Sequence, residues 1–138
     1  MLTILVIDDE PAVRGVIKLQ LDREGYAVVL CADGRAALDI LPKCDFAAAL
    51  IDLGLKPVGK RHVIEAIREA EPTLPIAVMS GALVRVDNDS IPGLPSHIDG
   101  LHQLPKPFKP SELIELVSVL TRPASRFETW PVRIGARL

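Results

Sequence analysis

The sequence predicts a single α/β domain built on a five-stranded, doubly wound parallel sheet with helices on both faces. Three observations predict this class. Short aliphatic runs alternate along the chain with segments of helical periodicity, which is the pattern of β–α units. The runs are apolar throughout rather than at every second residue, as in strands that are covered on both faces. A chain of 138 residues, 49% of them hydrophobic, is also long enough to bury one core.

The predicted strands are short runs rich in Ile, Val, Leu and Ala. They cover residues 3–7, 26–31, 46–51, 76–79 and 101–104. These lengths are ordinary for strands of globular proteins. Because ligands of such sheets bind at the carboxyl ends of the strands, the residues that follow each run are the first candidates for function.

The predicted helices show apolar residues at helical spacing and clear end signals. They cover residues 11–24, 34–41, 61–70 and 111–120. Pro11 suits a first helical position and Gly25 a helix end. Asp33 is expected to cap the second helix, which Pro42 closes. The inward stripe of the first helix is formed by Val13, Val16, Ile17 and Leu21.

Charge, cysteines and the N-terminus exclude several classes of protein. A net charge of −2 argues against a surface devoted to nucleic acid, so no direct DNA binding is expected. Cys31 and Cys44 lack metal-binding neighbours, and we expect reduced thiols in a cytoplasmic protein. The apolar run at residues 1–7 is too short for a signal peptide or a membrane span, so no membrane insertion is expected.

Polar residues gather where the predicted strands end. Asp8 and Asp9 follow the first strand, Asp52 the third, Ser80 the fourth and Lys106 the fifth. Each residue alone has an ordinary explanation, since acids cap helices, serine favours turns and most lysines are solvated. Folding does not require all five at one edge, so their coincidence predicts a site. The three histidines have no metal-ligand spacing, and surface or loop roles are expected for them.

This residue set suits phosphoryl transfer with a hard cation. Three carboxylates brought together repel one another and favour a bound cation. Mg²⁺ prefers oxygen ligands and commonly combines one or two carboxylates with water and phosphate oxygens. A carboxylate can act as the nucleophile and form an aspartyl phosphate. Lys106 would then neutralise phosphoryl charge, and the Ser80 hydroxyl would donate a hydrogen bond to a phosphoryl oxygen.

The ordered set resembles the response regulator receiver family of two-component signalling, to which chemotaxis regulators belong. The matching segments are Asp8-Asp9, Asp52 after an aliphatic strand, Ser80 before Gly81-Ala82, and Lys106-Pro107-Phe108. The resemblance covers residues 2–121. It implies a flavodoxin-like fold with strand order 2-1-3-4-5.

By this resemblance Asp52 is the phosphoacceptor in a Mg²⁺-dependent reaction. Asp9 would bind the ion directly and Asp8 largely through water. Asp52 and the backbone carbonyl of Gly54 would be the remaining protein ligands.

The resemblance also implies roles on the phosphoryl side of the site. Ser80 would move toward the phosphoryl group and Lys106 would pair with it. The Lys106–Pro107 peptide bond is expected to be cis. The donor would be a sensor histidine kinase or a histidine phosphotransfer protein. The downstream protein is unknown, and a homodimer is left open.

The chain departs from the family pattern at three places. Gly54 and Ala82 replace polar side chains that affect loss of the phosphoryl group, so a long-lived phosphorylated state is expected. Gln103 stands where an aromatic residue usually responds to the serine. Residues 82–100 form a longer stretch than usual, which predicts an atypical fourth-helix region. The residues that break it are Pro92, Gly93 and Pro95.

Residues 1–121 are expected to form the receiver domain and residues 122–138 a C-terminal tail without an output domain. So short a segment cannot form a helix-turn-helix module or a catalytic domain. The tail contains Phe127 and Trp130 among four arginines. Docking of the tail on the domain, a second copy or a partner is favoured over disorder, because exposing these aromatic side chains is costly.

The predicted function is a phosphorylation-dependent signalling switch, which changes partner binding and is not an enzyme with turnover. A first alternative is a phosphate-independent binding domain of the same fold. A second is a Mg²⁺-dependent phosphatase with an aspartyl nucleophile. The second is disfavoured because such enzymes need an acid two residues after the nucleophile, where Asp52 is followed by Gly54.

Overall fold

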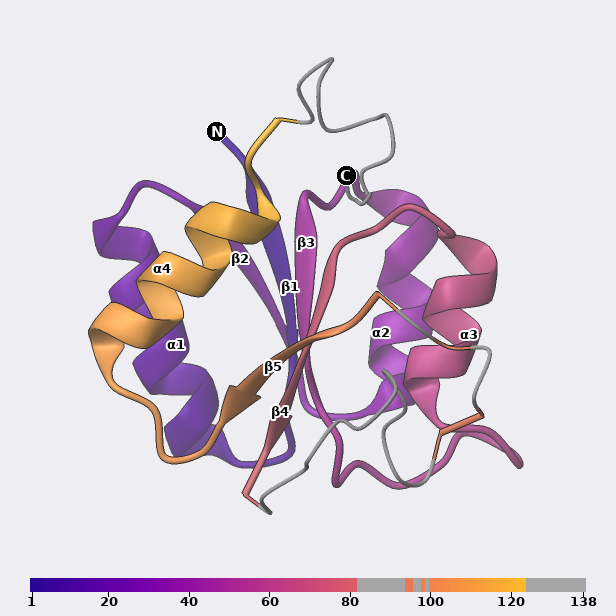
Figure 1. The fold of residues 1–138 in the computed structure, drawn as a ribbon. Coiled ribbons are helices and arrows are strands. Elements are labelled where there is room, and N and C mark those ends of the chain that lie inside the picture. The colour runs from indigo at the N-terminus through magenta and orange to yellow at the C-terminus, as the bar shows by residue number, and fades with distance from the viewer. Residues whose placement is uncertain (82–93, 96–97, 99, 124–138) are drawn as a thin grey trace.

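The computed structural model describes residues 1–81, 94–95, 98 and 100–123, and its centre is one five-stranded parallel sheet (Figure 1). The strands are β1 (Thr3–Ile7), β2 (Ala27–Cys31), β3 (Ala48–Asp52), β4 (Ile76–Ser80) and β5 (His102–Pro105). Their spatial order is β2-β1-β3-β4-β5, and every neighbouring pair is parallel. The predicted fold class and strand order are confirmed.

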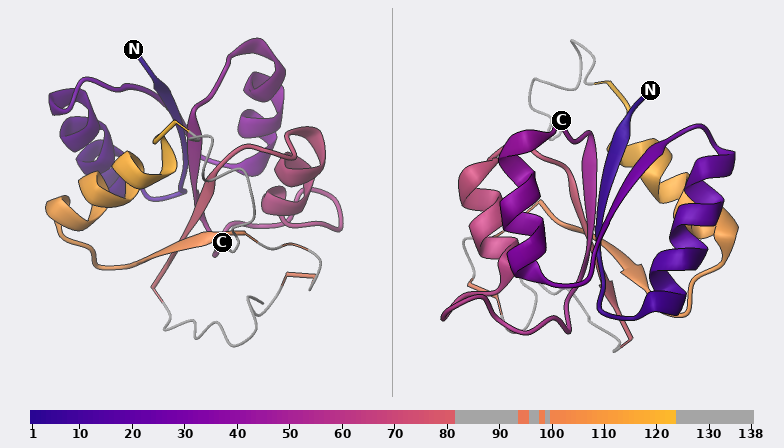
Figure 2. Two further views of the ribbon diagram at one scale, coloured as in Figure 1. Left: turned by 45° about the horizontal axis from the view of Figure 1, so that its top comes forward. Right: turned by 180° about the vertical axis from the view of Figure 1, so that it is seen from behind.

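Helices cover both faces of the sheet. They are α1 (Pro11–Arg23), α2 (Gly34–Ile40), α3 (Val63–Ala70) and α4 (Pro110–Leu120), with a short 3₁₀ turn at Leu41–Lys43. Helices α1 and α4 lie on one face, and α2 and α3 lie on the other, as the front and back views show (Figures 1 and 2).

Each face has its own apolar core, and β1 contributes to both. Ile4 and Val6 pack on the side of α1 and α4, whereas Leu5 and Ile7 pack on the side of α2 and α3. All four side chains are fully buried. Successive side chains of a strand point to opposite faces, so a strand covered on both sides must be apolar throughout. This accounts for the continuous apolar run at residues 3–7.

Local differences from the predicted elements have clear causes. Helix α3 begins at Val63, because His62 is its extended N-cap residue. Asp33 caps α2 as predicted, accepting a hydrogen bond from the Ala36 N–H at 2.8 Å. The prediction that Val16 faces inward is wrong, since this residue is 50% exposed while the α1 residues Ile17 and Leu21 are fully buried.

Several sequence predictions fall outside the described residues. These are the atypical fourth-helix region with Ala82, Pro92 and Gly93, and the tail from residue 124 onward. The division into a domain over 1–121 and a tail over 122–138 stays a prediction. Within the described residues, no helix has both the length and the apolar character needed to cross a membrane.

Candidate functional site

The carboxyl edge of the sheet brings the predicted polar residues together. Asp52 is the last residue of β3, and Ser80 is the last residue of β4. Asp8 and Asp9 follow β1 directly, and Lys106 follows β5. The register keeps these ends level, because Asp52 lies opposite Met79 and Ser80 lies opposite Pro105. The edge is the lower one in Figure 1.

Lys106 is the link between the acids. Its Nζ lies 2.7 Å from Oδ2 of Asp8, 3.6 Å from Oδ1 of Asp52 and 3.4 Å from Oε1 of Glu10. The Lys106 side chain is only 15% exposed and that of Asp8 is fully buried. A buried charge without a partner is very costly, so the Asp8–Lys106 pair fixes the position of the ammonium group.

The Asp8 carboxylate is held at both oxygens. Oδ1 accepts a hydrogen bond from the Glu10 N–H at 2.9 Å, while Oδ2 accepts from Lys106. The Arg14 guanidinium donates to the Asp8 backbone carbonyl at 2.8 Å and so fixes the same residue from α1. Asp9, by contrast, is exposed. The prediction that Asp9 is the direct ligand and Asp8 acts through water fits this geometry and stays a prediction.

Asp52 lies in an environment of opposing effects. Burial raises the pKa of its carboxyl group above the ordinary value, and the negative charges of Asp8 and Asp9 act in the same direction. The Gly54 N–H, which donates to Oδ1 at 3.2 Å, and the Lys106 charge lower the pKa and offset part of the rise. The site therefore disfavours a fully charged acid cluster unless further positive charge joins it.

At Lys106 the neighbouring charges, and not burial, determine the direction of the pKa shift. Burial disfavours its ammonium form, but the hydrogen bond to Asp8 and the charges of Asp52 and Asp8 outweigh burial, and the pKa of Lys106 is raised. Lys106 is therefore a permanent cation beside Asp52 at neutral pH. Its peptide bond to Pro107 is cis, as predicted.

The acids can hold a hard cation. Among the described residues, Asp8, Asp9 and Glu10 each offer a carboxylate oxygen, and these atoms lie within 4.8 Å of one another. Carboxylate oxygens beside a buried acid with a raised pKa fit a small divalent ion such as Mg²⁺. The other two predicted ligands, Asp52 and Gly54, are not part of this group: Asp52 ends β3, and Gly54 lies two residues later in the loop that follows.

Ser80 completes the edge. It is half-buried, and its backbone carbonyl accepts a hydrogen bond from the Lys106 N–H at 2.8 Å. The backbone thus ties the ends of β4 and β5 together, so Ser80 and Lys106 keep a fixed spacing. Ala82, which was paired with Gly54 in the prediction of a long-lived phosphorylated state, lies outside the described residues.

Three residues at the site were not singled out from the sequence. Glu10 joins the acid cluster and contacts Lys106, and its signal was the unbroken Asp-Asp-Glu run. Arg14 lies one helical turn after Glu10, which places it beside the end of β1. His62 holds the loop after Asp52 through its ring, although a loop role had been expected for it only in general terms.

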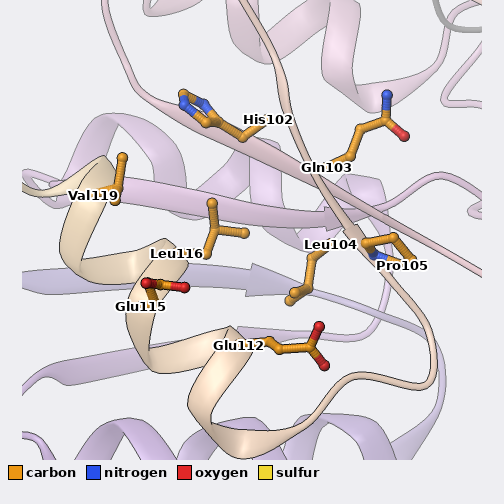
Figure 3. Close-up of a pocket in the computed structure, with 8 residues that line it drawn as sticks. All are labelled: His102, Gln103, Leu104, Pro105, Glu112, Glu115, Leu116 and Val119. Atoms are coloured by element: carbon orange, nitrogen blue, oxygen red, sulfur yellow. The ribbon is translucent and has the colours of Figure 1, made fainter. Parts of the chain in front are cut away.

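A separate groove of about 320 Å³ lies between β5 and α4 (Figure 3). The strand contributes His102, Gln103, Leu104 and Pro105, and the helix contributes Glu112, Glu115, Leu116 and Val119. Leu104 points toward the helix, whereas Gln103 points to the other side of the strand. Gln103, the polar replacement for the usual aromatic residue, is half-buried there. Burial lowers the pKa of the His102 ring, which favours its neutral form at this groove.

Comparison with known protein families assigns the chain to one of them. The model of the response regulator receiver domain family matches residues 4–118. The chain belongs to the response regulator receiver domain family. Every predicted site residue in the described part of the chain lies at the carboxyl edge described above.

Individual relatives agree with this assignment. The receiver domain is 33% identical over 119 residues to the response regulator MprA of Mycolicibacterium vanbaalenii. The aligned region covers 86% of this chain and 50% of MprA. The chain spans about half the length of the curated relatives it matches.

Solved structures share the fold. The receiver domain of the Francisella response regulator 1452 has a TM-score of 0.72 at 26% identity, covering 88% of this chain and 97% of that one. The response regulator TrrA of Thermotoga maritima, solved in complex with Mg²⁺–BeF, has a TM-score of 0.71 at 26% identity, covering 87% of this chain and 99% of that one.

Proposed function

We propose that this receiver domain is a phosphorylation-dependent signalling switch in which Asp52 accepts a phosphoryl group. The observation that carries the proposal is the position of Asp52 at the end of β3, 3.6 Å from the ammonium group of Lys106 and beside the acid cluster. The acid supplies a nucleophile, and the lysine supplies charge for the incoming phosphoryl oxygens. The proposal makes the chain a substrate of its own reaction and not an enzyme with turnover.

The chemistry follows from the residues in place. A carboxylate oxygen of Asp52 attacks the phosphorus of a phosphohistidine, the P–O bond forms, and the P–N bond breaks. The imidazole leaves with the electron pair of that bond and is protonated, and an aspartyl phosphate remains. Lys106 and the Ser80 hydroxyl hold phosphoryl oxygens, which favours the transition state because phosphoryl transfer depends mainly on positioning and charge.

Asp9, Asp52 and the Gly54 carbonyl would hold Mg²⁺, with Asp8 acting through water. The ion would supply positive charge to the phosphoryl oxygens. Burial and the neighbouring carboxylates raise the pKa of Asp52, and a bound cation would favour its ionised, nucleophilic form.

The donor protein is expected to approach over an apolar surface next to the site. A groove lined by Ala12, Val13 and Val16 of α1 and by Phe108 continues directly to Glu10 and Lys106. A sensor kinase or phosphotransfer protein whose histidine lies on a helix can bury apolar residues there while the histidine reaches Asp52. Val16→Glu should slow transfer from a protein donor and leave labelling by a small donor unchanged.

Intact-protein mass spectrometry tests the central proposal. Wild type, Asp52→Asn and the control Asp39→Asn, an exposed acid on α2, are incubated with acetyl phosphate with and without Mg²⁺. We expect a phosphoryl-sized mass gain in wild type and the control, and none in Asp52→Asn or without Mg²⁺. Labelling of Asp52→Asn to the wild-type level would refute the assignment. Absence of both labelling and Mg²⁺ binding in wild type would favour a phosphate-independent binding domain.

The remaining functional expectations stay predictions. A cytoplasmic location is expected from the sequence, a homodimer is left open there, and the downstream protein is unknown. The expected long lifetime of the phosphorylated state rests on Gly54 and Ala82, and decay of the labelled mass over time would measure it.

A further inference from the structure

One imidazole ring joins the two ends of the loop between β3 and α3. His62, the last residue before α3, has both ring nitrogens in hydrogen bonds. Nδ1 accepts from the Ile64 N–H at 3.1 Å, and Nε2 lies 2.9 Å from the Leu53 carbonyl oxygen. A backbone N–H can only donate and a carbonyl can only accept, so the proton must be on Nε2.

The peptide that His62 holds is the one that touches the candidate phosphoacceptor. The Leu53 carbonyl and the Gly54 N–H belong to the same peptide unit, and that N–H donates to Oδ1 of Asp52 at 3.2 Å. Because a trans peptide is planar, fixing the direction of the carbonyl also fixes the N–H on its opposite side. A hydrogen bond at the carbonyl additionally polarises the peptide and strengthens its N–H as a donor.

The peptides on either side of this one have backbone partners of their own. The Leu55 N–H, in the peptide that follows, donates to the Asp52 carbonyl at 3.4 Å. The Leu53 N–H donates to the Met79 carbonyl at 2.8 Å, which anchors the preceding peptide to β4. The far end of the loop is held separately, by a reciprocal backbone pair between Val58 and Arg61. Within the described residues, His62 is the side chain that joins the Leu53–Gly54 peptide to the start of α3.

We propose that His62 is a positioning residue for the Asp52 reaction: its Nε2–H orients the Leu53–Gly54 peptide so that the Gly54 N–H faces the Asp52 carboxylate. The inference rests on the proposed function of Asp52. It adds that the speed of phosphorylation depends on a ring outside the acid cluster. The same ring also caps α3, with the Glu65 carboxylate accepting from the His62 N–H at 3.1 Å, so the two roles must be separated.

His62→Asn separates them. Asparagine is a good N-cap residue and can accept from the Ile64 N–H, but it has no atom where Nε2 lies. Glu65→Ala is the matched control, because it weakens the same helix start without touching Leu53. Far-UV circular dichroism and urea unfolding establish that each variant folds. His62→Ser offers a second N-cap residue if the Asn variant is unstable.

The readouts are the rate of labelling over a range of acetyl phosphate concentrations at saturating Mg²⁺, and the amide ¹H shift of Gly54 in ¹⁵N-labelled protein. In His62→Asn we expect labelling about 10-fold slower, with the donor KM unchanged and the Gly54 amide signal displaced. Glu65→Ala should match wild type in both. A wild-type rate and an unmoved Gly54 signal in His62→Asn would overturn the proposal. If wild type itself is not labelled, the proposed function fails, while the Gly54 signal still decides whether the ring holds the peptide.

Discussion

Replacement of Gly34 by alanine should destabilise the protein, although the same replacement usually stabilises a helix. Gly34 is the buried first residue of α2, and a Cβ atom there would lie 2.6 Å from Cγ2 of Val58 and 3.0 Å from Cβ of Val63. Carbon atoms at contact prefer separations of roughly 3.5–4.0 Å, so one of the two elements must move. Val58 belongs to the loop after Asp52, and valine has little rotational freedom to yield.

The expected loss follows from overpacking. Extra methyl groups in a packed core cost about 1–3 kcal/mol. Gly15→Ala is the control, because Gly15 is an exposed residue inside α1 with no atom within 4 Å of the added Cβ. There the alanine should stabilise the protein by about 0.5–1 kcal/mol.

Urea unfolding followed by circular dichroism measures both effects. We expect the midpoint to fall for Gly34→Ala and to rise for Gly15→Ala, with equal slopes, since neither change alters the surface exposed on unfolding. A Gly34→Ala variant as stable as wild type would refute the close contact between α2 and the loop. Equal shifts in the same direction for both variants would show that backbone entropy, and not packing, governs the two sites.

Three further results are expected. Burial raises the pKa of Asp52, so ionisation of this carboxyl group opposes folding. Asp52→Asn should therefore be more stable than wild type at pH 7. The difference in unfolding free energy should vanish as the pH falls below the ordinary carboxyl pKa of 3.8. A constant difference at all pH values in urea titrations would contradict this. Mg²⁺ at 100 times its dissociation constant should raise the unfolding free energy of wild type by about 2.7 kcal/mol, and Asp9→Asn should lose most of this gain. Urea unfolding of both proteins with and without Mg²⁺ measures the difference, and an equal gain in the two would contradict a role of Asp9 in binding the ion. Lys106→Met leaves the buried Asp8 carboxylate without its cation and should lower the free energy of unfolding, measured with urea, by about 3 kcal/mol. Lys18→Met, the control, breaks an exposed ion pair and should lower it by about 0.4 kcal/mol. Similar losses in both variants would show that the Asp8 pair is not effectively buried.

The sequence predicted the sheet well because burial on both faces leaves an unambiguous signal. The run at residues 3–7 could be read as a buried strand, and the placement of Asp52 and Lys106 then followed from parallel topology. Helix faces were harder to predict. Val16 fits the apolar period of α1 as well as Ile17 does, but only tertiary packing decides how wide the buried stripe is.

Site details that depend on side-chain geometry were beyond the sequence. Nothing in the order of residues shows that Lys106 lies closer to Asp8 than to Asp52; the structure places its Nζ 2.7 Å from Oδ2 of Asp8 and 3.6 Å from Oδ1 of Asp52. The role of His62 was hidden for a similar reason. The predicted helix over residues 61–70 placed His62 inside it, and only the fold shows that the residue is the N-cap and that its ring reaches the Leu53 carbonyl.

Helix α4 also determines where any following segment begins. It starts beside the carboxyl edge of the sheet and runs back to the opposite edge (Figure 1). Its 11 residues span about 16 Å. At its far end Thr121 lies within hydrogen-bonding distance of the Tyr26 hydroxyl, at 3.4 Å, which ties the end of the helix to the start of β2. A segment beyond Pro123 therefore leaves from a tethered point remote from Asp52. If Asp52 accepts a phosphoryl group as proposed, salt screening weakens the direct effect of its charge at that point, and the sheet and helix α4 are the connected structure between the two.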